Sequence, residues 1–403
     1  MNVSANKKRG GRLNDSSRHA FLPVDAPAAL LAGRIDLGEG PTPVLVRGGR
    51  VEDVSRVTPL IAELLERDDL ATLRGEPLFA LDELARRAAA QDPARPFLLS
   101  PVDLQVVKAA GVTFALSAIE RVIEERARGD SAVAADVRGR IESRIGAEIR
   151  SVVPGSPEAA RLKEALIEDG LWSQYLEVAI GPDAEIFTKS PVLSTVGWGA
   201  EIGVRSDSTW NNPEPEVVVI VDGQGRPRGA ALGNDVNLRD FEGRSALLLG
   251  KAKDNNASCA IGPFIRLFDD GFTMRDVEAA EVTLEVDGPE GYRLEGSSSM
   301  RQISRPPAEL VRQALSEHHY PDGFALFLGT LFAPVQDRDE PGRGFTHKVG
   351  DVVRIASPKL GVLENRVTTS KAAAPWALGI RGLIENLVGR GLIGSAARKR
   401  DAA

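Results

Sequence analysis

The chain has 403 residues, of which 42% are hydrophobic and 27% are charged, and its formal net charge is −7. This acidic balance disfavours a nucleic-acid-binding protein, which usually carries a basic patch, and no run approaches the roughly 18 apolar residues of a transmembrane helix. The single cysteine, Cys259, excludes an intrachain disulfide and cysteine-rich metal sites. Because no secretory pattern opens the sequence, we expect a cytoplasmic protein.

The length of the chain and the changes in composition along it predict more than one domain. Residues 1–20 are polar and mostly basic, which is typical of a disordered tail. We expect a small N-terminal domain at 21–105, with a proline-containing linker near its end, and a larger catalytic domain at 106–370. A C-terminal helix and a basic tail should fill 371–403.

Strand signals open the N-terminal domain. Gly33–Asp36 and Val44–Val51 are strand-like, and Gly48-Gly49 is typical of a hairpin turn. Residues 57–91 have apolar positions at helical spacing and predict helix.

Helix dominates the start of the larger domain. A short strand is expected at 108–113, and the pattern of 114–177 is mainly helical, which places a helical insertion at about 116–177. Pro154 and Pro157 predict a break within it.

Beyond Ile180 the sequence is rich in short β-branched runs separated by Gly, Pro, Asn and Asp. These runs lie at 217–222, 230–233, 281–286, 325–328 and 352–355. The regular strand–helix alternation of a doubly wound fold is missing, and no G-x-G-x-x-G or phosphate-binding P-loop occurs. The sequence therefore predicts an α+β fold with a β-rich larger domain.

Three acidic residues form the most informative pattern. Glu214 and Glu216 stand at i and i+2 at the mouth of an apolar run, so a strand would point both to one side. Asp235 follows after the length of a strand, a turn and a return strand, which would bring it beside them. Repulsion among three close carboxylates is relieved by a hard divalent cation, Mg²⁺ first and then Mn²⁺ or Ca²⁺. The alternative is an ordinary solvated strand start.

These residues resemble the motifs of the fumarylacetoacetate hydrolase family. The matches are the E-x-E pair, the run Gly233–Asp240, and Lys253 followed by Gly262-Pro263. Further matches occur in order at Phe327–Thr330, Gly350–Val353 and Gly361–Val367. The resemblance spans about residues 108–370 and implies a mixed β-roll domain.

The resemblance also implies roles for individual side chains. Glu214, Glu216 and Asp235 would hold the cation, Lys253 and Arg239 would face the substrate, and Thr330 would belong to a substrate-binding loop. Lysine suits that place because burial or neighbouring cations can bring its pKa toward neutrality. Lys251 is a competing candidate, whereas Lys189 and Lys359 are expected to be solvated.

One departure from the family bears on the reaction. Hydrolytic members carry N-Y-x-x-H-x-x-E, but here Ser117 replaces the histidine while Glu120 remains. Serine without a base cannot take a proton from water at neutral pH, so the usual hydrolytic pair is absent. Glu120 is the expected base and Ser117 a substrate contact; alternatively, Glu120 is a surface charge beside Arg121, and Lys253 is the base.

Members without that histidine include dehydratases of 2-keto-3-deoxy sugar acids, which this sequence resembles over nearly its whole length. The implied activity is conversion of 2-keto-3-deoxy-D-xylonate to 2-oxoglutarate semialdehyde and water in non-phosphorylative pentose catabolism. The alternatives are an acylpyruvate-type hydrolase of C–C bonds and a non-catalytic sugar-acid-binding protein. The expected partners are a small sugar acid and further copies of the chain, as a dimer or tetramer, with neither nucleic acid nor membrane.

Overall fold

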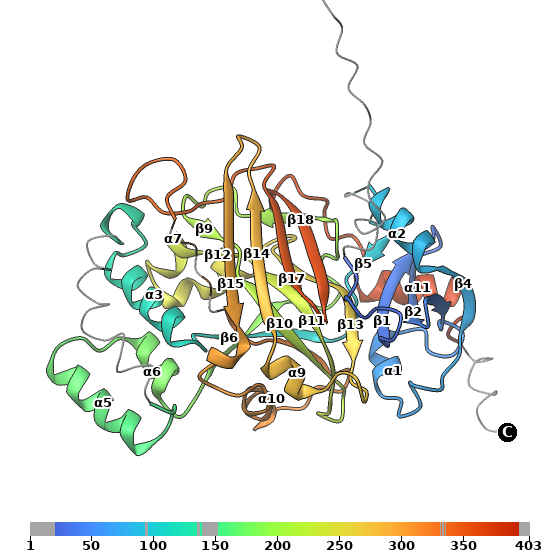
Figure 1. The fold of residues 1–403 in the computed structure, drawn as a ribbon, viewed down its shortest axis with the longest axis horizontal. Helices are drawn as coiled ribbons and strands as arrows, with labels where there is room; N and C mark the ends of the chain where they lie inside the picture. Colours follow the sequence, from blue (N-terminus) through green and yellow to red (C-terminus); the bar gives the residue numbers. More distant parts are fainter. Residues whose placement is uncertain are drawn as a thin grey trace, which may run out of the picture.

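A computed structural model of the protein describes residues 21–92, 96–134, 138, 152–330, 332, 334 and 336–394. The predicted N-terminal tail, part of the linker after residue 92, part of the helical insertion and the basic tail lie outside the described residues. The mixed α+β architecture is confirmed: two large sheets carry helices at both ends of the molecule (Figure 1).

The larger sheet combines strands from both the N-terminal region and the larger domain. Its strands are, in order of pairing, β4 (Glu76–Ala80), β3 (Arg50–Asp53), β2 (Pro41–Arg47), β1 (Leu31–Asp36), β13 (Cys259–Leu267), β11 (Pro227–Asp235), β10 (Pro215–Val221), β16 (Phe324–Phe327), β6 (Val106–Gly111) and β7 (Glu185–Ser190), with β5 (Leu98–Leu99) also paired to β1. Because β1 pairs antiparallel with β13, the N-terminal region extends the sheet of the larger domain.

The second sheet packs against the first. It consists of β15 (Arg293–Ser299), β14 (Glu281–Asp287), β17 (Val352–Ser357), β18 (Gly361–Thr369) and β8 (Glu201–Val204), and a small ladder joins β9 (Asn211–Asn212) to β12 (Asn237–Leu238). Val219 and Leu232 of the larger sheet share one buried apolar cluster with Leu284 and Ile355 of the second. Burial on both faces explains why β10 is continuously apolar after Glu216.

Most helices cover the two ends of the sheets, whereas α9 (Met274–Glu278) and α10 (Pro307–Leu315) lie below their middle (Figure 1). The other described helices are α1 (Ile61–Leu65), α2 (Leu81–Ala89), α3 (Ala115–Arg126), α5 (Pro157–Glu168), α6 (Gln174–Ile180), α7 (Arg239–Glu242), α8 (Leu249–Lys253) and α11 (Ile380–Gly389). The single helical region predicted at 57–91 is instead two helices separated by β4. Gly75 and Pro77 stand at this break, and Gly75 packs so closely on the backbone of Asp53 that a side chain there would clash.

Both predicted hairpins are present. Gly48 and Gly49 have positive φ angles of 53° and 76° and join β2 to β3. Between β10 and β11, the carboxylate of Asp222 accepts hydrogen bonds from the backbone N–H groups of Gln224 and Arg226. This second turn fixes the register that the candidate site depends on.

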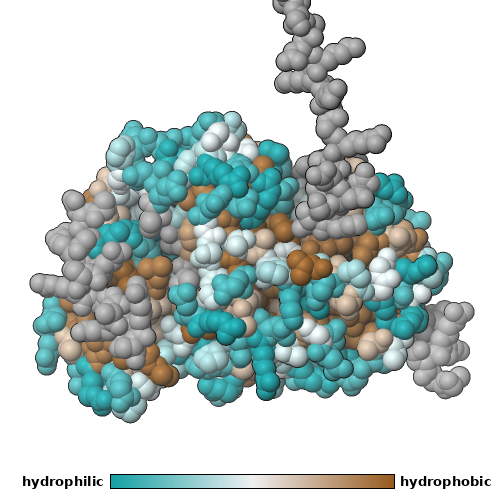
Figure 2. Space-filling view, viewed as in Figure 1, coloured by the Kyte–Doolittle hydropathy of each residue, from teal (hydrophilic) through white to brown (hydrophobic). Residues whose placement is uncertain are grey.

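The face drawn in Figure 2 is mostly hydrophilic, with apolar residues in separated patches. Every helix in the described part of the chain is too short or too polar to span a bilayer.

Candidate active site

The β10–β11 hairpin brings the three predicted carboxylates together. Glu216 pairs with Gly233 in the ladder, and the N–H of Asp235 donates to the carbonyl of Glu214 at 3.1 Å. One oxygen from each of Glu214, Glu216 and Asp235 lies within 4.8 Å of the others, and all three residues are buried. The predicted convergence of these side chains is therefore confirmed.

Two lysines lie against this cluster. The Nζ of Lys253, at the end of α8, is 2.5 Å from Oε2 of Glu214 and 3.1 Å from Oδ2 of Asp235. The Nζ of Lys189 is 2.8 Å from Oδ1 of Asp235, and its side chain is fully buried. The expectation that Lys189 is solvated is therefore wrong. Strand alternation could not have indicated this, because the register between β6 and β7 is bulged at Lys189.

Burial and neighbouring charges set the pKa values in opposite directions. Burial, with Asp235 and Glu214 alongside, raises the pKa of Glu216 well above its usual value. Burial would also raise the pKa of Asp235, but Lys189 and Lys253 lower it below its usual value. Burial alone would lower the pKa of Lys253, yet Asp235, Glu214 and Glu242 raise it, opposite to the direction expected from the sequence.

Arg121 on α3 is the cation that the sequence reasoning missed. Its guanidinium lies 2.8 Å from Oε1 of Glu214 and 2.7 Å from Oε2 of Glu124, and it also pairs with Glu242. Ser117, one helical turn earlier, lines the same cavity. Because residues at i and i+4 share a helix face, the assignment of Ser117 to the site could have indicated Arg121.

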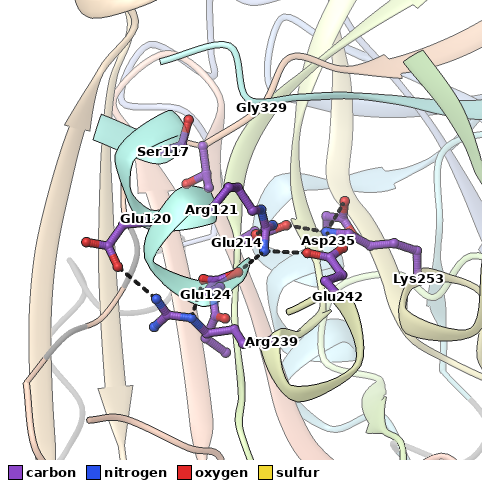
Figure 3. Close-up of polar contacts among 12 residues, drawn as sticks. Ser117, Glu120, Arg121, Glu124, Glu214, Asp235, Arg239, Glu242, Lys253 and Gly329 are labelled. Carbon is purple, nitrogen blue, oxygen red and sulfur yellow. Dashed lines mark hydrogen bonds and ion pairs between the residues drawn. The ribbon is translucent and has the colours of Figure 1, made fainter. Parts of the chain in front are cut away.

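Glu120 and Arg239 lie away from the carboxylate cluster. Nη2 of Arg239 is 2.8 Å from Oε2 of Glu120, and Nε of Arg239 is 2.6 Å from Oε1 of Glu124. Glu120 also accepts from Nη2 of Arg138 at 2.8 Å. Figure 3 shows Glu120 pointing to the opposite side of α3 from Glu214 and Asp235. A one-residue step on a helix turns the side chain by about 100°, so Arg121 and Glu120 cannot both face the cavity.

The carboxylates border a narrow cavity of about 40 Å³. Among the predicted residues, Glu214, Glu216, Asp235, Lys253, Ser117 and Thr330 line it, whereas Glu120 and Arg239 do not. The Ser117 hydroxyl accepts from the backbone N–H of Phe114 at 3.2 Å, which caps the start of α3, and it donates to the carbonyl of Phe114 at 2.8 Å.

The backbone at Gly329 completes the wall. Its N–H donates to Oε2 of Glu216 at 2.6 Å, and its φ angle is 91°. A side chain at this position would collide with the Thr113 hydroxyl, so glycine is needed for the close approach.

Two further carboxyl groups of the lining, Glu185 and Glu242, were not predicted. Burial raises the pKa of Glu185, despite the opposing effects of Arg121 and Lys253. Burial likewise raises the pKa of Glu242 to about 7, against the same two cations. Oε1 of Glu242 is buried without a hydrogen-bond partner among the described residues. The cavity therefore retains the capacity to bind or exchange a proton.

The donor set fits a divalent cation. Glu120 and Glu124 are matched by Arg138 and Arg239, so the remaining charges decide the balance. Five carboxyl groups face three cations here: Glu185, Glu214, Glu216, Asp235 and Glu242 against Arg121, Lys189 and Lys253. Full ionisation would leave two negative charges in a buried place, which one Mg²⁺ would neutralise using carboxylate oxygens.

Comparisons with known proteins identify a family and relatives of the chain. The fumarylacetoacetate (FAA) hydrolase C-terminal model matches residues 174–368. The chain is 32% identical over 179 residues to the 2-dehydro-3-deoxy-D-arabinonate dehydratase of Saccharolobus solfataricus, a match that covers 44% of this chain but only 57% of that relative. It is 32% identical over 212 residues to the probable 2-keto-3-deoxyxylonate dehydratase of Haloferax volcanii, covering 53% of this chain and 68% of the relative.

The fold is also found in solved structures. A 2-keto-3-deoxy-D-arabinonate dehydratase complexed with magnesium and 2,5-dioxopentanoate superimposes with a TM-score of 0.60 at 20% identity. The match covers 84% of this chain and 99% of that one. At this identity the likeness establishes the shared fold.

Proposed function

The chain belongs to the fumarylacetoacetate hydrolase family, and from this membership we propose that it is a Mg²⁺-dependent dehydratase of 2-keto-3-deoxypentonate. The product would be 2-oxoglutarate semialdehyde (2,5-dioxopentanoate), formed with loss of one water. The observation that carries the proposal is the buried set of Glu214, Glu216 and Asp235 with Lys253 against it. Two relatives are named as dehydratases of such acids.

A cation held by these three carboxylates would polarise the 2-keto group and acidify the protons on C3. Lys253 would remain protonated beside the same carboxylates, where its charge stabilises negative charge that develops on the substrate oxygen. Mn²⁺ or Ca²⁺ are alternative occupants because they use the same oxygen donors.

Arg121 is the proposed anchor for the substrate carboxylate. Arginine binds carboxylates through two parallel hydrogen bonds, and the guanidinium of Arg121 now contacts Glu214, Glu124 and Glu242. A cation on Glu214 would replace one of these contacts. A five-carbon acid is larger than the cavity of about 40 Å³, so we expect α3 to shift when substrate binds.

Glu185 is our proposed proton-transfer group. Its carboxyl lines the cavity, and its pKa is raised by burial, as suits a group that takes a proton from C3 and delivers one to the departing C4 hydroxyl. Loss of the C4 hydroxyl as water leaves an unsaturated 2-keto acid. This acid then tautomerises to the aldehyde, so the net change is the loss of one water. The prediction that Glu120 is the base would require its carboxylate to leave Arg239 and Arg138.

One stereocentre distinguishes the possible 2-keto-3-deoxypentonate substrates. In a 2-keto-3-deoxypentonate, C2 is trigonal and C3 is a methylene, so C4 is the only stereocentre left. The acids derived from D-xylonate and D-arabinonate are therefore the same molecule, which both relatives' names fit. We propose the D series as substrate, and the L epimer at C4 as the compound that tests selectivity.

Product identification tests the function. Purified protein with Mg²⁺ and 2-keto-3-deoxy-D-pentonate should yield the semialdehyde, followed by proton NMR, and EDTA should stop the reaction. Release of pyruvate and a two-carbon aldehyde would instead identify a C–C bond-cleaving enzyme. Saturable binding without turnover would identify a sugar-acid-binding protein.

The biological setting remains part of the proposal. Formation of the semialdehyde would place the protein in non-phosphorylative pentose catabolism. A homodimer or tetramer is also still a prediction, which light scattering of the purified chain would test.

A further inference from the structure

A second cavity lies apart from the carboxylate cluster. It has a volume of about 210 Å³ and is bordered by β1, β5, the segment 193–201 and the segment 374–378 before α11. None of its lining residues lines the active-site cavity. In Figure 1, β1, β5 and α11 group at one end of the molecule, and α3 is at the other.

The cavity contains an incompletely bonded buried cation, Arg34. Its side chain lines the cavity although the residue is only 5% exposed. Nε donates to the carbonyl of Ser100 at 2.8 Å, but Nη1 is buried with no hydrogen-bond partner among the described residues. No carboxylate of the described chain lies within ion-pair distance of Arg34, and the nearest charge effect on it comes from Asp103. A charged hydrogen-bond donor that is buried without a partner lowers the stability of the folded protein.

The other residues that line the cavity indicate which ligand could pair with Arg34. Most are apolar, including Leu99, Leu193 and Trp376. The Ser100 hydroxyl accepts from Thr195 at 2.8 Å, which leaves its own hydrogen free for a ligand. The lining also contains one acid, Glu201. Because Arg34 is the one cation among these lining residues, a singly charged ligand fits better than a phosphate dianion, whose second charge would add to that of Glu201.

We propose that this cavity is a binding site for a small monocarboxylic acid with a short apolar or aromatic body. The carboxylate would accept hydrogen bonds from the guanidinium of Arg34 and the hydroxyl of Ser100, since a planar guanidinium matches carboxylate geometry. The apolar body would pack on Leu99 and on Trp376, which is 48% exposed at the edge of the cavity. This site is separate from the proposed reaction.

Benzoate binding in EDTA tests the site without the metal centre. Titration calorimetry should show saturable binding, accompanied by a change in the fluorescence of Trp376 that is lost in Trp376→Phe. Benzamide has the same shape without the charge and should bind at least about 10-fold more weakly. Equal binding of benzamide, or no saturable binding of benzoate, would overturn the proposal.

Variants locate the bound acid. Arg34→Met should weaken benzoate at least about 10-fold, because a charge-assisted hydrogen bond is lost. The exposed Arg301 provides the matched control, and Arg301→Met should bind as wild type. Should Arg34→Met fail to fold, Trp376→Ala decides, since it trims an exposed wall and should weaken binding several-fold.

Two further measurements distinguish this cavity from the active site and from a contact between subunits. Glu216→Gln should keep benzoate affinity, and its loss would place the acid in the active site instead. If an acidic side chain of a second copy normally fills the cavity, benzoate will dissociate an oligomer in light scattering. Such dissociation would contradict a free acid as the occupant, whereas binding without a change in mass supports it.

Discussion

Two groups of buried charges meet at α3, where Glu124 contacts both Arg239 and Arg121, and the two groups differ in charge balance. In one group, Glu120 and Glu124 are matched by Arg239 and Arg138 in close ion pairs, with Arg239 also over the ring of Trp210 at 4.5 Å. In the other group, around the cavity, carboxyl groups outnumber cations. Matched charges hold elements together, whereas a surplus of one sign favours binding of a ligand of the other.

The difference between the two groups shows that the type of a residue does not by itself reveal whether its side chain has a structural or a catalytic role. Glu120 and Glu185 are both glutamates near α3 and the sheet, yet one is paired with two arginines and the other lines the cavity. Breaking each group in turn should therefore have different consequences for ligand binding and for stability.

The largest effect is expected from Glu216→Gln, which removes one carboxylate from the surplus group. Metal catalysis contributes several kcal/mol, so turnover should fall about 1,000-fold or more, together with Mg²⁺ affinity. Steady-state kinetics and Mn²⁺ binding followed by electron paramagnetic resonance would measure both. Normal turnover at limiting metal would refute the assignment of the ligand.

Lys189→Met tests whether the buried lysine stabilises the acidic group. Removing one partner of a buried ion pair costs about 3–5 kcal/mol, and Asp235 would be left beside fewer cations. Denaturant unfolding should show this loss in the metal-free protein. The control is Lys359→Met, a half-exposed lysine paired with Asp276, which should change stability by about 0.5 kcal/mol or less. Equal effects would show that burial of Lys189 does not matter.

Glu185→Gln and Glu120→Gln form a matched pair across α3. Loss of a general acid–base group should lower kcat about 100-fold or more in Glu185→Gln, while Mg²⁺ still binds. Glu120→Gln should lower the free energy of unfolding by about 1–3 kcal/mol with a much smaller change in kcat. The reverse pattern would restore Glu120 as the base and remove Glu185 from the mechanism.

The smallest expected effect is a pH dependence of the metal-free protein. A carboxyl whose pKa is raised by folding binds more protons folded than unfolded, so stability falls as pH rises between the two values. For Glu242 this window runs from 4.5 to about 7, and Glu216 shifts in the same direction. Mg²⁺ competes with these protons and should therefore stabilise more at neutral than at acid pH.

Thermal unfolding with and without Mg²⁺ at about pH 5 and about pH 7.5 measures that difference. In Glu216→Gln the dependence of Mg²⁺ stabilisation on pH should shrink. A Mg²⁺ effect that is equal at both pH values would show that the cation does not bind at the raised-pKa carboxyls.

Local patterns in the sequence determined much of this protein. Period-two alternation, turn residues and motif order fixed the β10–β11 hairpin and the meeting of Glu214, Glu216 and Asp235, because strand register follows from short-range geometry. They also predicted the mixed α+β fold. The same patterns wrongly predicted one helical region at 57–91. Apolar periodicity does not reveal that Gly75 must pack on the backbone of Asp53 in β3.

Only the tertiary structure decided which charges meet. Arg121 contacts Glu214 across 93 residues of sequence. Lys189 is buried against Asp235, and its ammonium also donates to the carbonyls of Val236 and Lys253, which belong to distant segments. Whether a charged side chain is paired, solvated or aimed into a cavity depends on long-range packing and on the dielectric around it. That is why the sequence brought the three candidate ligands together but did not place Arg121 or Lys189 beside them or show which side of α3 faces them.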